Sequence, residues 1–202
     1  MTIKSPFIVI PDLISPSLCE QIVDDVGFHS PDFDVKGVPK VSRCKDDTYE
    51  QILYKRVKPH IASFEQYYNF EHKLTERFIF EWMPQDSLID VHCENCEYIE
   101  NKWVKTKQRD FTGVLFLCDY NERAPFDTDF ECYGGKLEFI NHNFSFNPNR
   151  GTLVVFPSEP RFCNASSRVL AGDAYQVRFH LAAKTSYIHD MSLFPGDYRN
   201  WF

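Results

Sequence analysis

Residues 133–158 read YGGKLEFINHNFSFNPNRGTLVVFPS, and this stretch decides the fold prediction. It holds two short runs, Lys136 to Ile140 and Thr152 to Phe156, with the length and the aromatic and β-branched content of strands. Turn-forming residues bound both runs: Tyr133-Gly134-Gly135 comes before the first, and Asn147-Pro148-Asn149-Arg150-Gly151 before the second. The stretch therefore predicts short strands separated by tight turns.

The same pattern continues outward from this stretch. Further strands are predicted at Arg77 to Trp82, Leu88 to Val91, Phe111 to Leu117 and Tyr175 to Leu181. The chain before residue 73 has helical spacing instead. A first helix begins with the capping pattern Ser17-x-x-Glu20, and a second begins near Thr48 and is interrupted at Pro59. Helices followed by many short strands predict a mainly β jelly roll with flanking helices.

Length and composition limit what this fold can do. The chain has 202 residues, which fits one domain over 1–202. Within it, 1–72 form a strand and helices packed on the sheet, 75–183 form the β core, and 184–202 form a tail. The net charge of −7 argues against a nucleic-acid partner, and no apolar segment is long enough for a membrane. Seven cysteines without a signal peptide suggest reduced thiols in a cytoplasmic protein.

One candidate metal site follows the strand predicted at Leu88 to Val91. In an extended segment, His92 and Glu94 point to the same side, so both side chains could bind one ion. The alternative is two polar residues on a solvated edge. Cys93 and Cys96 between and beside them have the spacing of redox or zinc cysteines, but they follow a strand and no second pair completes a zinc site. We interpret these thiols as structural.

The motifs downstream of His92 and Glu94 strengthen the hypothesis of a metal site. Arg109 to Leu117, Gly134-Gly135-Lys136-Leu137-Glu138-Phe139 and Gly151-Thr152-Leu153-Val154-Val155-Phe156-Pro157-Ser158 follow in an order and spacing that resembles the prolyl-hydroxylase-like branch of the 2-oxoglutarate/Fe(II) oxygenases. The resemblance covers about residues 75–183 and implies a double-stranded β-helix. It also implies Fe(II) held by a His-x-Asp pair and a distal His, with 2-oxoglutarate clamped by a basic residue. Similar sequences occur among tailed phages.

This sequence departs from the family pattern at each part of the site. The family Asp is Glu94, and the position of the distal His is Asn164, whose amide is a poor ligand for Fe(II). The position of the clamp is Ala174. Arg178 shares a strand face with Ala174 and could bind the cosubstrate if that face points inward. His180 lies on the same face and is an alternative source of the missing imidazole.

Two functions follow from these residues. The first is a protein that keeps the oxygenase fold, has lost full catalytic competence and serves as a protein-binding or structural module, for instance in a phage virion. It needs no cofactor. The alternative is an active, divergent dioxygenase that uses Fe(II) and 2-oxoglutarate, bound by His92, Glu94, Asn164 and Arg178, to hydroxylate a protein or peptide side chain.

Three further segments suggest partner surfaces. Lys102, Lys105, Lys107 and Arg109 are a solvated loop or an electropositive rim for an acidic partner, and Trp103 lies among them. Residues 119–133 form an acidic, aromatic loop expected at the opening of the jelly roll. The aromatic end, with Phe194, Tyr198, Trp201 and Phe202, packs on the body or on a partner.

Overall fold

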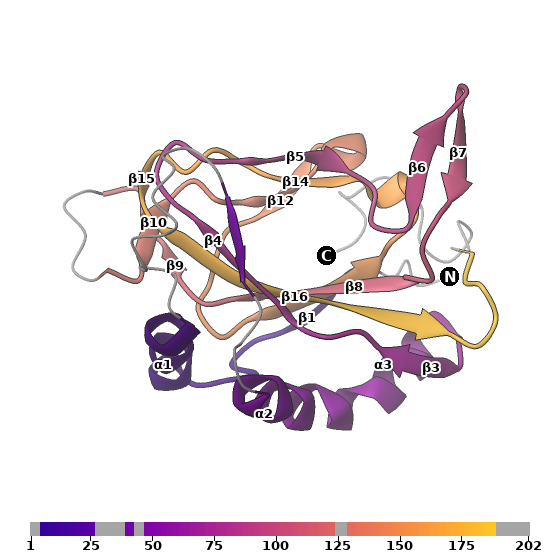
Figure 1. The fold of residues 1–202 in the computed structure, drawn as a ribbon, viewed down its shortest axis with the longest axis horizontal. Helices are drawn as coiled ribbons and strands as arrows, with labels where there is room; N and C mark the ends of the chain where they lie inside the picture. Colours follow the sequence, from indigo (N-terminus) through magenta and orange to yellow (C-terminus); the bar gives the residue numbers. More distant parts are fainter. Residues whose placement is uncertain (1–4, 27–38, 43–46, 124–128, 189–202) are drawn as a thin grey trace.

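The chain folds around a large sheet and a smaller sheet that faces it (Figure 1). The computed structural model describes residues 5–26, 39–42, 47–123 and 129–188. The large sheet has the strand order β1-β13-β8-β16-β4-β2, with β3 also paired to β16. Its strands are β1 (Ile8–Ile10), β2 (Lys40–Ser42), β3 (His72–Thr75), β4 (Ile79–Met83), β8 (Phe111–Phe116), β13 (Leu153–Pro157) and β16 (Ala174–Ala183).

The smaller sheet has the order β12-β11-β14-β5. It consists of β5 (Ile89–His92), β11 (Leu137–Phe139), β12 (Phe144–Phe146) and β14 (Asn164–Ser166), with the short helices η3 (Ile140–His142) and η4 (Pro160–Phe162) beside it. Between the two sheets lies an aromatic core centred on Phe7, whose ring is 4.6 Å from that of Phe139. These layers confirm the predicted mainly β jelly roll with flanking helices.

The remaining strands lie outside these two sheets. Three short strands, β9 (Asp119–Tyr120), β10 (Glu131–Tyr133) and β15 (Ala171–Gly172), pair at one end. At the other end, β6 (Cys96–Ile99) and β7 (Lys102–Lys105) form a hairpin that projects from the body (Figure 1). The sequence interpretation missed this hairpin. The expected partner surface at the C-terminal aromatics lies outside the described residues.

Helices cover the outer face of the large sheet (Figure 1). They are α1 (Pro16–Val26), α2 (Thr48–Val57), η2 (Lys58–His60) and α3 (Ile61–Tyr68), so the predicted interruption at Pro59 divides the second helix as expected. The predicted cap at Ser17 was wrong. Ser15 accepts a hydrogen bond from the amide of Leu18 because the helix starts at Pro16, two residues earlier than a cap at Ser17 predicts. None of the described helices is long and apolar enough to cross a membrane.

Strand β16 positions the candidate site because its two faces differ in chemistry. All ten of its residues are buried. Val177 and Phe179 pack into the core beneath the helices. The alternate residues Gln176, Arg178 and His180 point to the other side, into the space between the sheets. Arg178 therefore faces inward, which was the condition for its binding a cosubstrate, and a row of buried polar groups lies between the sheets.

Candidate functional site

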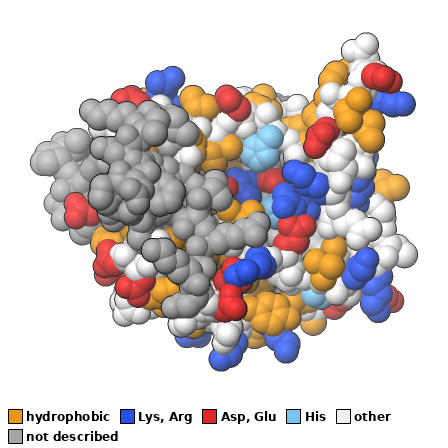
Figure 2. Space-filling model, in the orientation of Figure 1, with side chains coloured by type: hydrophobic (Ala, Val, Ile, Leu, Met, Phe, Trp, Pro, Cys, Tyr) orange, Lys and Arg blue, Asp and Glu red, His pale blue; other side chains and the backbone are white. Residues whose placement is uncertain are grey.

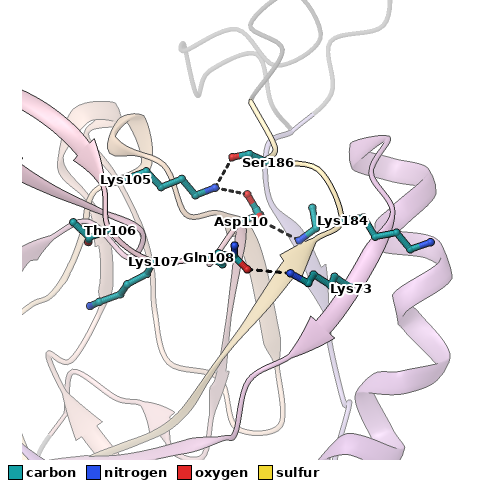
Figure 3. A pocket seen from close by; sticks show the side chains of 9 residues that line it. Lys73, Lys105, Thr106, Lys107, Gln108, Asp110, Lys184 and Ser186 are labelled. Atoms are coloured by element: carbon teal, nitrogen blue, oxygen red, sulfur yellow. Dashed lines mark hydrogen bonds and ion pairs between the residues drawn. The ribbon is translucent and has the colours of Figure 1, made fainter.

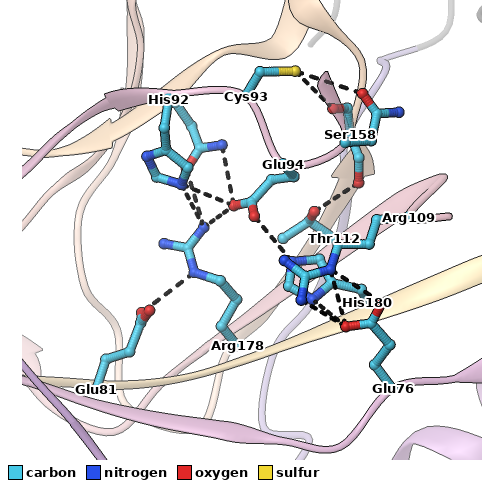
Figure 4. Close-up of polar contacts among 12 residues, drawn as sticks. Glu76, Glu81, His92, Cys93, Glu94, Arg109, Thr112, Ser158, Arg178 and His180 are labelled. Atoms are coloured by element: carbon cyan, nitrogen blue, oxygen red, sulfur yellow. Dashed lines mark hydrogen bonds and ion pairs between the residues drawn. The ribbon is translucent and has the colours of Figure 1, made fainter. Parts of the chain in front are cut away.

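The predicted site residues come together from three strands (Figure 4). His92 ends β5, and Glu94 follows two residues later. Asn164 begins β14 and lies directly opposite His92 in the antiparallel pairing of β14 with β5. Arg178 reaches the same point from β16 in the large sheet. The structure therefore places all four residues named from the sequence at one position between the sheets.

Glu94 is the centre of this cluster. Its Oε1 accepts hydrogen bonds from Arg178, from His92 Nε2 at 3.1 Å and from Asn164 Nδ2 at 3.4 Å, while His180 Nε2 donates to Oε2 at 2.9 Å. Burial alone would raise the pKa of Glu94, but the charge of Arg178 and the hydrogen bonds from His180 and His92 hold it well below its ordinary value. Glu94 is therefore a buried, ionised carboxylate.

His92 is held by two oxygen atoms. Its Nδ1 donates to the carbonyl oxygen of Asp90 at 2.8 Å, and its Nε2 faces the carboxylate of Glu94. Because both partners accept hydrogen bonds, the ring satisfies both only when both nitrogens carry a proton. Burial lowers the pKa of His92, yet the hydrogen bond and charge of Glu94 outweigh it and raise the pKa above 6.5. The two contacts therefore favour a ring with protons on both nitrogens, a form that offers no lone pair to a metal.

Arg178 fills the point on which the predicted ligands converge. Its Nη1 donates to Glu94 Oε1 and to Asn164 Oδ1, the latter at 3.1 Å, and lies 3.5 Å from His92 Nε2. Its Nε donates to Glu81 Oε2 at 3.3 Å. Burial opposes the charge of the guanidinium, but Glu81 and Glu94 raise its pKa above the ordinary value. Arg178 is thus a permanent cation between two carboxylates.

These residues do not fit a resident Fe(II). The side chains at the positions that the resemblance assigns to the metal, His92, Glu94 and Asn164, all contact Nη1 of Arg178, so a guanidinium occupies the point where an ion would be bound. A divalent ion there would also meet the positive charge of Arg178. Among the described residues, no group of three or more His, Cys, Asp and Glu side chains is placed to hold a metal.

The residues expected to clamp 2-oxoglutarate do not fit that role either. Ala174, at the family position, is buried, and a Cβ added to Gly135 would lie 2.7 Å from its methyl group. Arg178, the residue expected to replace the clamp, is committed to Glu81 and Glu94 of the protein itself. The guanidinium that the sequence suggested for 2-oxoglutarate is therefore already paired. Its role as a clamp stays a prediction.

The sequence interpretation missed three residues of the network, Glu76, Glu81 and Gln176. Glu81 of β4 accepts hydrogen bonds from Arg178 and, at 2.5 Å, from Gln176 Nε2. Glu76 binds Arg109 and lies 3.6 Å from His180 Nδ1. The polar contact with His180, followed by Arg109, lowers the pKa of Glu76 to about 2. A charged residue inside the apolar run of β4 was the one signal that could have identified Glu81.

Thiols lie beside this network. Cys93 Sγ donates to the carbonyl oxygen of Ser158 at 3.3 Å (Figure 4), and the Cys93 thiol interacts with those of Cys163 and Cys96. The hydrogen bond with Cys163 is the largest cause that lowers the pKa of Cys93, to about 6. Described cysteines are all free thiols.

The predicted basic cluster divides between two places. Lys105 and Lys107 line a cavity of about 350 Å³ together with Lys73 and Lys184 (Figure 3). Lys105 Nζ pairs there with Asp110 at 2.7 Å. Arg109 instead turns to Glu76 and the buried network. Residues 109 and 110 therefore separate the lysine-lined cavity from the candidate site, and binding of an acidic partner there stays a prediction.

Solved structures share this fold. No protein-family model and no curated protein matches the sequence. A viral collagen prolyl hydroxylase from Paramecium bursaria Chlorella virus-1 superposes with a TM-score of 0.64 at 13% identity, covering 90% of this chain and 97% of that one. A prolyl-4-hydroxylase from Pseudomonas putida gives 0.63 at 11% identity, covering 90% and 94%. A Trichoplax adhaerens prolyl hydroxylase in complex with a hypoxia-inducible-factor peptide fragment gives 0.58 at 13%, covering 88% and 84%. The chain has the prolyl-hydroxylase-like oxygenase fold.

Proposed function

We propose that this chain has kept the fold of a prolyl-hydroxylase-like oxygenase, has lost its iron chemistry and acts as a protein- or peptide-binding module. The single observation that carries the proposal is the position of Arg178 Nη1, which contacts His92, Glu94 and Asn164 at once. A guanidinium at that point supplies the positive charge that balances Glu94 without a bound metal. The phage virion role expected from the sequence is a narrower form of this proposal.

The substitutions support one another physically. An imidazole at position 164 would face the guanidinium, whereas the amide oxygen of Asn164 accepts a hydrogen bond from it at 3.1 Å. The side chain of Glu94 is one methylene longer than that of Asp. Its two carboxylate oxygens accept hydrogen bonds from Arg178 and His180. The cluster is therefore an ion-pair network centred on Glu94 and Arg178 rather than a metal site that lacks one ligand.

A binding role is supported by the hairpin β6–β7. It projects from the body near the site and exposes Tyr98 and Trp103, whose rings lie 5.2 Å apart. Large exposed aromatic side chains are typical of protein-binding surfaces. The space-filling view shows hydrophobic side chains on this projection and basic side chains in the region below it (Figure 2). The Trichoplax neighbour holds a peptide fragment, and we extend binding of a peptide to this chain by analogy.

A divergent dioxygenase is the second candidate, and one observation favours it. His92 and His180 both bond with Glu94, so two imidazoles and a carboxylate meet in one cluster. These are the residue types of the facial triad that binds Fe(II). Such a site requires Arg178 to leave the cluster and both rings to turn a free nitrogen towards the ion.

Metal binding and turnover distinguish the two candidates. We would titrate the purified full chain with Mn(II) and Fe(II) under anaerobic conditions, and measure succinate formed from 2-oxoglutarate in air. The parent is expected to show neither binding nor succinate. Asn164→His/Arg178→Ala supplies an imidazole and removes the cation, so it should bind Mn(II) at least about tenfold more tightly than the parent.

The control is Asn164→Ala/Arg178→Ala, which removes the same guanidinium without supplying an imidazole. It should bind Mn(II) more weakly than the Asn164→His/Arg178→Ala variant. Stoichiometric Fe(II) binding and succinate formation by the parent would overturn the proposed loss of chemistry and establish the dioxygenase. Loss of that turnover in His180→Ala would then assign the third ligand.

A further inference from the structure

Two cysteines lie just past the end of the strand pair that carries the site. Strand β14 runs antiparallel to β5, with Asn164 opposite His92. Just past this pair, Cys163 precedes Asn164 and Cys93 follows His92. Continuing the register therefore sets Cys163 directly opposite Cys93, at the end of the ladder.

This placement suits a disulfide. Directly opposed residues of an antiparallel pair have Cα atoms about 4.5–5.5 Å apart, within the range that a disulfide spans. Each thiol also shifts the pKa of the other, which is consistent with sulfurs that lie near each other, and both are free thiols. Cys93 is half-buried, whereas Cys163 is 5% exposed. A small oxidant can therefore reach Cys93 before it reaches the more buried Cys163.

We propose that Cys93 and Cys163 are a peroxide-sensitive thiol pair whose oxidation to a disulfide ties β5 to β14 beside the site. The Cys93 thiolate attacks one oxygen of hydrogen peroxide, the O–O bond breaks, and Cys93 becomes a sulfenic acid as hydroxide leaves. The Cys163 sulfur then attacks the sulfenic sulfur, the S–OH bond breaks, and water leaves with the Cys163 proton. Two electrons pass from the sulfurs to the peroxide.

The disulfide acts on the network through its neighbours in sequence. Cys93 lies between His92 and Glu94, and Cys163 precedes Asn164. A covalent link between them fixes the separation of β5 and β14 one residue from the contacts of Arg178. This inference is independent of the proposed function, because it holds whether the cluster binds a guanidinium or a metal.

The chain contains a matched control pair. Cys118 and Cys132 have sulfur atoms 3.7 Å apart and are 1% and 0% exposed. These thiols are close enough to react with each other but lie in the core, where peroxide reaches them only when the protein opens. We expect the Cys93–Cys163 pair to oxidise at least about tenfold faster in the folded protein, because access controls thiol oxidation.

The test is a time course with hydrogen peroxide on the folded full chain, followed by alkylation and non-reducing tryptic mapping. Trypsin leaves Cys93 and Cys96 together in the peptide 78–102 and Cys163 in the peptide 162–168. We expect these two peptides to become linked in the parent and in Cys96→Ser, and dithiothreitol to separate them. Cys163→Ser and Cys163→Ala should give no such link.

The other outcomes decide against the proposal. A bond between Cys93 and Cys96 within peptide 78–102, or sulfinic acid at Cys93 with no linked peptide, would overturn it. So would oxidation of Cys118 and Cys132 at the same rate. The disulfide closes a loop of about 70 residues, so the oxidised Cys96→Ser protein should melt about 5–10 °C above its reduced form. An unchanged melting temperature with the link present would contradict the register.

Discussion

Arg178 Nη1 lies 3.1 Å from the Oδ1 atom of Asn164, and this hydrogen bond joins β16 of the large sheet to β14 of the small one. An amide oxygen at position 164 accepts from the guanidinium, and an ionised Glu94 on the other side neutralises it. The contact therefore links the two sheets at the point where the sequence resemblance predicts a metal.

Removing either partner of the Glu94–Arg178 pair alone should strongly lower the free energy of unfolding. Arg178→Met leaves Glu81 and Glu94 buried without their cation, and we expect a loss of about 3–5 kcal/mol in the free energy of unfolding. Glu94→Gln should cost a similar amount. The combined variant should lose at least about 1 kcal/mol less than the sum. Urea unfolding of the four proteins checks this, and strictly additive losses would contradict a direct pair.

Acid should weaken the fold through Glu76. Its pKa is lowered from 4.5 to about 2, mainly by the polar contact with His180 and then by Arg109. A lowered pKa stabilises the folded state above 4.5, and this contribution is lost as the pH falls from about 4.5 to about 2. Glu76→Gln removes the titrating group, so its unfolding free energy should fall less steeply over that window. Urea midpoints at several pH values measure the slope, and parallel curves would count against this assignment.

The contribution of His92 to stability should depend on pH in the opposite sense to that of Glu76. Although burial lowers its pKa, Glu94 raises it above 6.5, so its contribution is present below 6.5 and is lost as the pH rises through the folded value. Proton NMR of the ring should show a pKa above 6.5 in the parent and a lower value in Glu94→Gln. An unchanged value in that variant would show that the carboxylate does not hold the proton on His92.

Gly113 should tolerate no side chain because Phe179 lies against it. A Cβ at position 113 would come within 2.3 Å of the Phe179 ring. Gly113→Ala should therefore lower the free energy of unfolding by about 1–3 kcal/mol through overpacking. In a Phe179→Leu background, the same change should cost at least about 1 kcal/mol less. Thermal and urea unfolding of the four proteins test this relief, and an equal cost in both backgrounds would exclude the ring as the cause.

Much of the fold follows from local sequence patterns. The strands in the stretch 133–158 appear as β11 and β13, and the alternation in β16 correctly placed Arg178 and His180 on one face, which the structure turns inward. Hairpin β6–β7 was missed because it is exposed and carries charges. Its turn residues Glu100 and Asn101 have φ values of 48° and 62°, the left-handed pair of a tight hairpin turn, but Glu-Asn is a weaker sequence signal than Asn-Gly.

The candidate site was predictable in its members but not in its interactions. His92, Glu94 and Asn164 follow from motif spacing, and the structure brings them together. Spacing says nothing about Glu81, which lies 97 residues before Arg178 in sequence and bonds with it across paired strands. Whether Arg178 binds a cosubstrate or the protein depends on such distant carboxylates, so the sequence alone left that choice open.

The guanidinium between Glu81 and Glu94 also constrains how this site could change over generations. Replacing Asn164 by His alone would set an imidazole against Arg178, and replacing Arg178 alone would strand two buried carboxylates. Each single step towards an iron site therefore passes through a less stable protein, and only paired substitutions avoid it. Because Arg178 is paired with both carboxylates, a change to metal binding at this site requires two coordinated substitutions rather than one.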